Sequence, residues 1–129
     1  MSATTAALPH RVLVVDDNAH QRDGIAYLLA AQGMEVSTAG DGQEALHVLG
    51  AGLLHCLILL DLNMPVMDGW EFRRRQLLSR EWAGIPVLIL SGHPELKAVT
   101  HTMQAREVWA KPVEFALLLR AVDTHCGGH

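Results

Sequence analysis

The sequence predicts a single α/β domain in which a five-stranded parallel sheet carries helices on both faces. Five short strand-like segments, three of them runs of branched apolar residues, alternate with longer segments whose apolar residues recur at helical spacing. Each apolar run ends in a polar or turn-forming residue, as a buried strand does where it leaves a sheet. Strands separated by helices pair in parallel, because each helix carries the chain back to the edge where the next strand starts.

The first half of the chain accounts for three strands and two helices. The expected strands cover residues 11–15, 35–39 and 56–60. Asn18 and Asp41 stand just before the two helices, where their side chains can accept hydrogen bonds from the first helical turn. Glycines end both helices, because glycine tolerates the left-handed conformation found just past a helix end.

The second half supplies two strands and three helices. The strands are expected at residues 87–90 and 107–110. Asp68 caps a helix that runs to about residue 80, and Pro94 suits the first turn of a helix that continues through 105. The last helix has its apolar side chains at helical spacing from Phe115 onward.

Length and composition fit one folded domain. The chain has 129 residues, half of them hydrophobic, which is enough for one core and too short for two ordinary ones. We expect residues 1–10 to be a flexible lead-in, 11–126 to be the domain and 127–129 to be a tail. The net charge of −4 argues against broad binding to nucleic-acid phosphates. No segment reaches membrane-spanning length, so a soluble, cytoplasmic protein is expected.

The two cysteines are too few for a disulfide framework. We expect Cys56 to act as a small, unpaired core residue in a reducing setting. His125, Cys126 and His129 are interpreted as part of a frayed tail, which is a simpler reading than a metal site.

Polar side chains gather where the predicted strands end, at the edge of an open α/β sheet where function concentrates. They are Asp16, Asp17, Asp61, Ser91 and Lys111. Three close carboxylates repel one another unless a cation lies between them. Oxygen ligands suit hard cations, and Mg²⁺ binds through one or two carboxylates together with phosphate oxygens. The sequence therefore predicts a magnesium site at this edge.

The same groups suit phosphoryl transfer to a carboxylate. Asp61 ends a buried apolar run, and aspartate side chains act as nucleophiles in such transfers. The transferred group carries its charge on the equatorial oxygens. Mg²⁺, the Lys111 ammonium and the Ser91 hydroxyl would each stabilise part of that charge.

Four motifs resemble those of the receiver domain of two-component response regulators, and together they span about residues 11 to 125. They are Val-Leu-Val-Val-Asp-Asp at 12–17, Asp-Leu-Asn-Met-Pro-Val-Met-Asp-Gly at 61–69, Leu-Ser-Gly at 90–92 and Lys-Pro at 111–112. No single motif suffices, but the four in this order at strand ends are highly specific. The resemblance implies a doubly wound, flavodoxin-like fold with strand order 2-1-3-4-5 and five helices.

The resemblance implies a role for each of the three clustered aspartates and for Asn63. Asp61 is the expected phosphoacceptor. Asp17 is expected to bind Mg²⁺ directly, and Asp16 directly or through water. Asn63 is expected to contribute its backbone carbonyl to the same cation.

By the same resemblance, Ser91 hydrogen-bonds the phosphoryl group, Lys111 pairs with it, and the Lys111–Pro112 peptide bond is cis. The donor is expected to be a phosphohistidine on a histidine kinase or a histidine phosphotransfer domain. The domain is then a signalling module, not an enzyme: it catalyses only its own phosphorylation and slow dephosphorylation. In the family, the surface corresponding to 94–105, 107–110 and 113–125 carries output contacts and often forms homodimers. A stand-alone regulator and a receiver from a larger regulator or hybrid kinase both fit the sequence.

One position departs from the family pattern. A Tyr or Phe usually stands three residues before the lysine, and this chain has Val108 there. Trp109 follows and points to the opposite face by strand alternation, so either the usual coupling of hydroxyl to aromatic is absent or a bulge re-aims Trp109. We also hypothesise that His93 and Asn63, each two residues past a site residue, tune the lifetime of the phosphorylated state.

Three alternatives belong to other functional classes. The Val108 departure allows a receiver that acts as a phosphorylation-independent scaffold. A haloacid dehalogenase-type phosphatase also uses an aspartyl nucleophile, but it requires Asp-x-Asp after its first strand, where this chain has Asp16-Asp17-Asn18. A flavodoxin is less favoured still, because no Ser/Thr/Gly-rich phosphate loop follows the first strand.

Overall fold

The computed structural model describes residues 10–92 and 102–127. Three parts of the expected organisation lie outside these residues: positions 1–9 of the lead-in expected over 1–10, His93 with most of the helix expected from Pro94, and the tail residues 128–129. Among the described residues, no helix is both long and apolar enough to cross a membrane.

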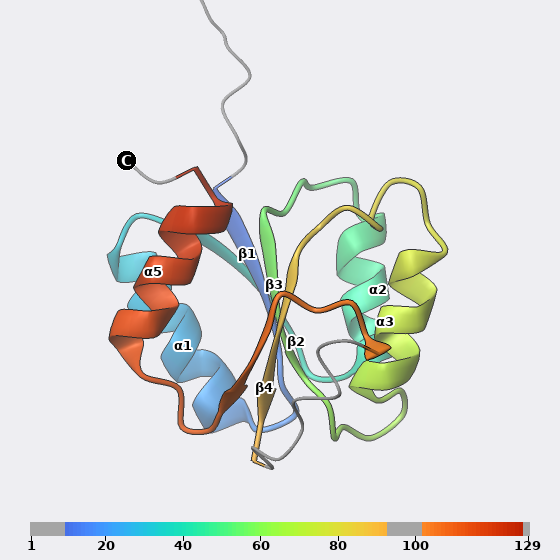
Figure 1. Ribbon diagram of the computed structural model, residues 1–129, viewed down its shortest axis with the longest axis horizontal. Coiled ribbons are helices and arrows are strands. Elements are labelled where there is room, and N and C mark those ends of the chain that lie inside the picture. The colour runs from blue at the N-terminus through green and yellow to red at the C-terminus, as the bar shows by residue number, and fades with distance from the viewer. Residues whose placement is uncertain (1–9, 93–101, 128–129) are drawn as a thin grey trace, which may run out of the picture.

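Five parallel strands form one sheet, in the order β2-β1-β3-β4-β5 (Figure 1), which confirms the predicted topology. The strands are β1 (Arg11–Val15), β2 (Glu35–Ala39), β3 (Leu57–Asp61), β4 (Val87–Ser91) and β5 (Glu107–Ala110). Every residue of β3 and β4 is buried. That burial explains why these two strands read as continuous apolar runs and not as an alternating pattern. β3 begins and ends one residue later than predicted, so that Asp61 is its last residue and pairs with Leu90.

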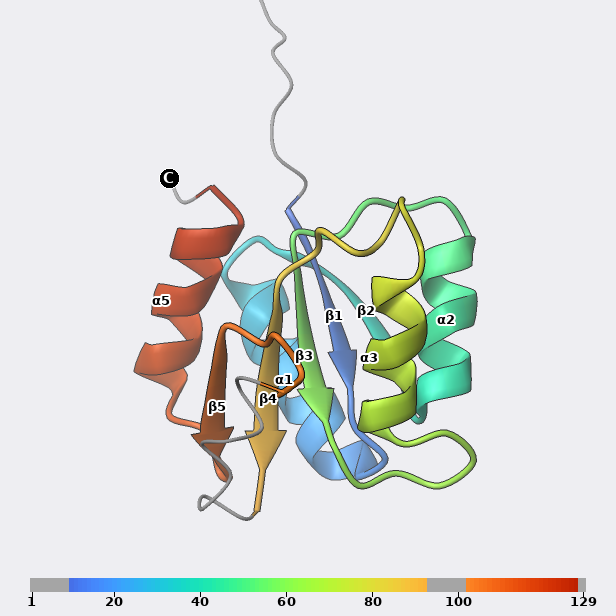
Figure 2. The same ribbon diagram turned by 45° about the vertical axis from the view of Figure 1, so that its right-hand side comes forward.

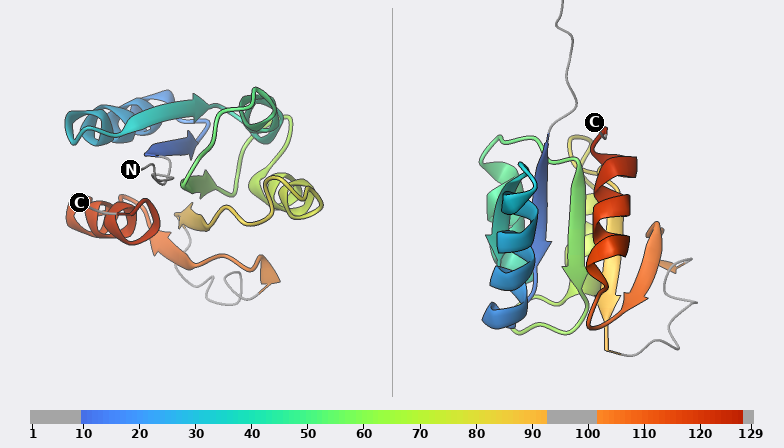
Figure 3. Two further views of the ribbon diagram at one scale, coloured as in Figure 1. Left: turned by 90° about the horizontal axis from the view of Figure 1, so that it is seen from above. Right: turned by 90° about the vertical axis from the view of Figure 1, so that its left-hand side faces the viewer.

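Four helices lie within the described residues and pack in two layers around the sheet. They are α1 (Ala19–Ala31), α2 (Gly42–Gly50), α3 (Gly69–Leu77) and α5 (Phe115–His125). Figures 1 and 3 show α1 and α5 on one face and α2 and α3 on the other. Each face has its own apolar core, because alternate residues of the central strands point to opposite sides.

The predicted helix caps are present. The side chains of Asn18, Asp41 and Asp68 each accept a hydrogen bond from the backbone N–H three residues on, at 3.0, 2.9 and 2.9 Å. α3 ends at Leu77, however, and not near residue 80 as predicted. The buried amide of Gln76 donates to the carbonyls of Trp82 and Ile85, at 2.7 and 3.1 Å, and these bonds hold the following segment back against the helix end.

The cysteines were predicted wrongly. Cys56 and Cys126 form a disulfide between positions 70 residues apart, with their Cα atoms 5.1 Å from each other. Cys56 is buried as expected, but Cys126 is fully buried as well and is not part of a frayed tail. The topology explains the pairing. α5 runs antiparallel to the strands, so its last turn returns to the edge of the sheet where β3 begins (Figure 2).

Candidate functional site

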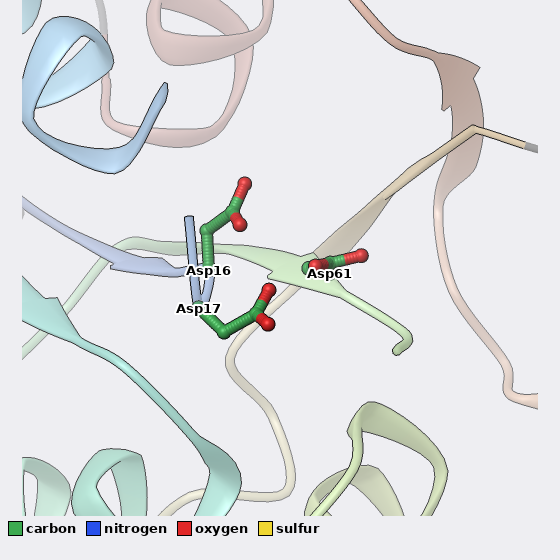
Figure 4. Close-up of side chains that lie close together, drawn as sticks. All are labelled: Asp16, Asp17 and Asp61. Atoms are coloured by element: carbon green, nitrogen blue, oxygen red, sulfur yellow. The ribbon is translucent and has the colours of Figure 1, made fainter. Parts of the chain in front are cut away.

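Three carboxylates meet at the edge of the sheet where the strands end. Asp16 and Asp17 follow β1, and Asp61 ends the neighbouring strand β3. The parallel register pairs Val15 with Leu60, so the next residues, Asp16 and Asp61, leave adjacent strands side by side. One carboxylate oxygen from each of the three aspartates lies within 4.8 Å of the others (Figure 4).

Asp16 is the most firmly held of the three. Its side chain is 1% exposed, its Oδ1 accepts a hydrogen bond from the Asn18 N–H at 2.9 Å, and its Oδ2 accepts one from Lys111 Nζ at 3.0 Å. Arg22 Nη1 donates to its backbone carbonyl at 3.2 Å. Both carboxylate oxygens therefore have a partner within the protein, which fixes the orientation of the side chain.

Lys111 connects the two buried aspartates. It follows β5, and its Nζ lies 3.0 Å from Asp16 Oδ2 and 3.4 Å from Asp61 Oδ2. The Lys111 N–H donates to the Ser91 carbonyl at 2.8 Å, which fixes the start of the loop to β4. The Lys111–Pro112 peptide bond is cis, as predicted.

Burial raises the pKa of Asp61. The attraction of Lys111 acts against this shift, and the like charge of Asp16 adds to it. Asp61 is 6% exposed, and one of its oxygens accepts a long hydrogen bond from the Asn63 N–H at 3.4 Å. The ionised form of Asp61 is therefore under-stabilised by the protein alone.

Charge and ligand chemistry fit a divalent cation at this edge. Three carboxylates and one ammonium leave two uncompensated negative charges when all are ionised. The candidate ligand atoms are carboxylate oxygens, which suit a hard cation. Asp17 is exposed, which leaves room for the water ligands that Mg²⁺ retains. The predicted donor set is therefore compatible with Mg²⁺.

Two further predicted residues, Ser91 and Asn63, lie at the same edge. Ser91 is the last residue of β4, is 1% exposed and pairs with Ala110 of β5. Asn63 is exposed and follows Asp61 by two residues. His93, the other residue expected to tune the site, lies outside the described part of the chain.

Two glycines shape the loop after Asp61, although no role was predicted for either. A Cβ on Gly69 would lie 2.4 Å from the Asp61 carbonyl oxygen, and one on Gly42 would lie 2.9 Å from the Met67 carbonyl oxygen. Their N–H groups donate to the Leu62 and Met67 carbonyls at 2.9 and 2.8 Å. Only glycine allows both close approaches, so these positions hold the loop against α2 and α3. The sequence shows the glycines but not the backbone that they meet.

Val108 and Trp109 lie on opposite faces of β5. Val108 pairs with Ile89 and packs into the core under α2 and α3, whereas Trp109 packs into the core under α1 and α5. The β4–β5 register is continuous from Glu107 to Ala110, so no bulge re-aims Trp109. Of the two alternatives left by the sequence, the bulge is therefore excluded.

Comparison with known proteins gives the family. The model of the response regulator receiver domain matches residues 12–123, and the chain belongs to this family of signalling domains. Receiver domains of two-component systems act with histidine kinases or phosphotransfer proteins and bind Mg²⁺ in an acidic pocket.

Two curated relatives are longer than this chain. The chain is 36% identical over 115 residues to the CAI-1 autoinducer sensor kinase/phosphatase CqsS of Vibrio cholerae, matching 87% of its own length and 17% of the relative. It is 31% identical over 115 residues to the transcriptional regulatory protein FixJ of Bradyrhizobium diazoefficiens, matching 88% of its own length and 55% of the relative. The chain thus spans only part of the length of these relatives.

Solved structures agree in fold. Chemotaxis protein CheY4 of Vibrio cholerae superposes with a TM-score of 0.81 at 32% identity, covering 91% of this chain and 98% of that one. A response regulator receiver protein from Pseudomonas putida gives a TM-score of 0.83 at 28% identity, covering 93% and 99%. Response regulator protein TrrA of Thermotoga maritima, solved in complex with Mg²⁺-BeF, gives 0.76 at 27% identity, covering 88% and 96%.

Proposed function

We propose that this receiver accepts a phosphoryl group on Asp61 from a phosphohistidine of a histidine kinase or histidine phosphotransfer domain, in a Mg²⁺-dependent reaction. The single observation that carries the proposal is the position of Lys111 Nζ, 3.0 Å from Asp16 and 3.4 Å from Asp61. A lysine shared by two buried carboxylates lies where its ammonium can neutralise the negative charge of a phosphoryl group added to Asp61.

In the proposed transfer, an Asp61 carboxylate oxygen forms a bond to phosphorus as the P–N bond to the donor histidine breaks. Asp16, Asp17 and Asp61, together with the Asn63 carbonyl, would hold a Mg²⁺ ion, which would supply positive charge to the phosphoryl oxygens.

Lys111 neutralises charge on the transferred group and Ser91 donates a hydrogen bond to it. Burial raises the pKa of Asp61, and the nearby Lys111 ammonium acts against this shift and favours the ionised form that attacks. Slow hydrolysis of the aspartyl phosphate by the domain itself completes the cycle.

The proposal is tested with a small-molecule donor. Purified protein is incubated with phosphoramidate, whose P–N bond resembles that of phosphohistidine, with Mg²⁺ or with EDTA, and intact mass is measured. We expect one added phosphoryl group only with Mg²⁺, none on Asp61→Asn, and normal uptake on Asp123→Asn, whose carboxylate is exposed on α5 and far from the site. Absence of uptake by the wild-type chain would overturn the proposal.

A scaffold that does not depend on phosphorylation is the second candidate, because Val108 replaces the aromatic that usually reports the modification. Here the discriminating measurement is hydrogen exchange of β4, β5 and α5 with and without the phosphoryl group. A wild-type domain that takes up the group without any change in these elements would favour the scaffold.

A homodimer is proposed through the surface that includes β5 and α5, part of which lies outside the described residues. Light scattering before and after phosphorylation tests it, with a doubling of mass expected on phosphorylation and an unchanged monomer contradicting it.

A further inference from the structure

The disulfide lies at the edge of the sheet where the strands begin, opposite the edge where they end and where the aspartates lie. Cys56 directly precedes β3, and Cys126 directly follows α5 as its C-cap residue. Figure 2 shows that α5 ends where the strands begin, whereas Asp61 stands at the far end of β3. Nothing in the proposed phosphoryl chemistry uses this crosslink, so its role is a separate question.

A cavity leads to one of the two cysteines. It has a volume of about 450 Å³, and its walls include Cys56, His55, His125, Trp82, Leu53 and Leu54. Cys126 does not line this cavity and is 0% exposed, whereas Cys56 lines it and is 6% exposed. A reagent that enters from solvent therefore reaches Cys56 and not Cys126.

The surroundings of both cysteines are compatible with free thiols. Cys56 Sγ lies 3.3 Å from the Arg11 carbonyl oxygen, so a reduced Cys56 thiol finds a hydrogen-bond acceptor already in place. Cys126 lies among apolar side chains of the core under α1 and α5, which suits an uncharged thiol. Leu118, Ala121 and Val122 keep α5 packed on the sheet without the crosslink.

We propose that Cys56 and Cys126 form a reversible redox site, which a dithiol reductant opens through the cavity while the domain stays folded, releasing the last turn of α5. A thiolate of the reductant attacks Cys56 Sγ, the S–S bond breaks, and Cys126 leaves as a thiolate that takes up a proton. The second thiol of the reductant then attacks the mixed disulfide, Cys56 is released as a thiol, and the reductant leaves as a disulfide. Two electrons pass from the dithiol to the protein.

The released segment is short, because the buried side chains of α5 hold its first two turns. The Cys126 N–H donates to the Val122 carbonyl at 2.8 Å, and Thr124 Oγ1 donates to the Arg120 carbonyl at 2.9 Å. Without the crosslink these bonds belong to a helix end at which residues 123 and 124 are exposed. Hydrogen exchange of residues 123–126 is therefore the local readout.

The first test follows reduction of the unphosphorylated protein by dithiothreitol under native conditions, with maleimide tagging and intact mass to count thiols. We expect both thiols to appear faster than the domain unfolds globally, and exchange to rise first and most at 123–126. Reduction that keeps pace with global unfolding, or a protein purified in air that has two free thiols, would overturn the proposal. Neither outcome depends on Asp61.

Two variants sharpen the test. Gly84 lines the cavity, and a Cβ there meets no atom within 4 Å, so Gly84→Phe is expected to slow reduction several-fold without a large change in melting temperature. Reduction of Gly84→Phe at the wild-type rate would show that the cavity is not the route. Cys56→Ser with Cys126→Ala retains a donor to the Arg11 carbonyl, and its exchange at 123–126 should match that of the reduced wild type.

Discussion

The two edges of the sheet, at the carboxyl and at the amino ends of its strands, are built from opposite kinds of chemistry. At the edge where the strands end, three carboxylates and Lys111 form an electrostatic site whose charges are not balanced by the protein alone. At the edge where the strands begin, a mostly apolar cavity borders a covalent bond between Cys56 and Cys126. The difference indicates that the first edge is arranged to gain a ligand, and the second to hold one end of α5 in place.

The largest expected effect is on stability and comes from the second edge. Replacing both cysteines, Cys56→Ser with Cys126→Ala, removes a crosslink that closes a 70-residue loop. We expect the free energy of unfolding to fall by about 4 kcal/mol from the increased entropy of the unfolded chain. Urea unfolding of the oxidised wild type and the variant measures the difference. Equal stabilities would mean that the crosslink contributes nothing to the fold.

A buried arginine on α3 tests whether the two edges function independently. Arg73 of α3 donates to the Met103 and Gln104 carbonyls at 2.9 and 2.8 Å and to the Gln76 side chain at 2.7 Å. Arg73→Met leaves these acceptors without a donor, so we expect a loss of about 3 kcal/mol in unfolding free energy. Arg75→Met, on the exposed side of the same helix, should change stability by less than about 0.5 kcal/mol.

If the edges are independent, Arg73→Met at a temperature where it remains folded will retain both phosphoryl uptake and native-state reduction of the disulfide. Loss of either property in the folded variant would show that α3 couples the edges.

At the first edge, Lys111→Met removes the cation shared by Asp16 and Asp61. We expect phosphoryl uptake from phosphoramidate to slow by about 10²-fold, because one stabilising charge is lost beside the transferred group. The initial rate of mass gain measures the effect. A rate within a factor of two of the wild type would assign Lys111 a purely structural role.

The smallest expected effect is on the pH dependence of stability without Mg²⁺. Burial and the charge of Asp16 raise the pKa of Asp61 above 3.8, so just above pH 3.8 the folded domain keeps a proton that the unfolded chain has lost. Stability therefore falls as pH rises from 3.8 through the raised pKa, and Asp61→Asn should abolish this contribution.

Thermal melts at several pH values, with EDTA present, measure it. The difference between wild type and Asp61→Asn should grow with pH across the window, while Asp123→Asn should follow the wild type. Parallel curves for wild type and Asp61→Asn would contradict the raised pKa.

The first edge could be predicted from the sequence because each of its residues stands where an apolar run ends. Strand periodicity located Asp16, Asp61 and Lys111, and parallel pairing brought them together. The alternation of side chains along a strand likewise predicts that Val108 and Trp109 lie on opposite faces of β5, and they do.

The second edge could not be predicted in this way. The pairing of Cys56 with Cys126 depends on where the last turn of α5 lies relative to the start of β3, and no local pattern records that position. The early end of α3 was missed for a related reason, since it depends on the hydrogen bonds of Gln76 to a segment further along the chain.

Locating the phosphoryl group on the chain decides whether Asp61 is the acceptor. Protein treated with phosphoramidate and Mg²⁺ is reduced with borohydride, which converts an aspartyl phosphate to homoserine, and peptides are sequenced by mass spectrometry. We expect homoserine at position 61 alone. Homoserine at 16, 17 or 68, with Asp61 unchanged, would contradict it.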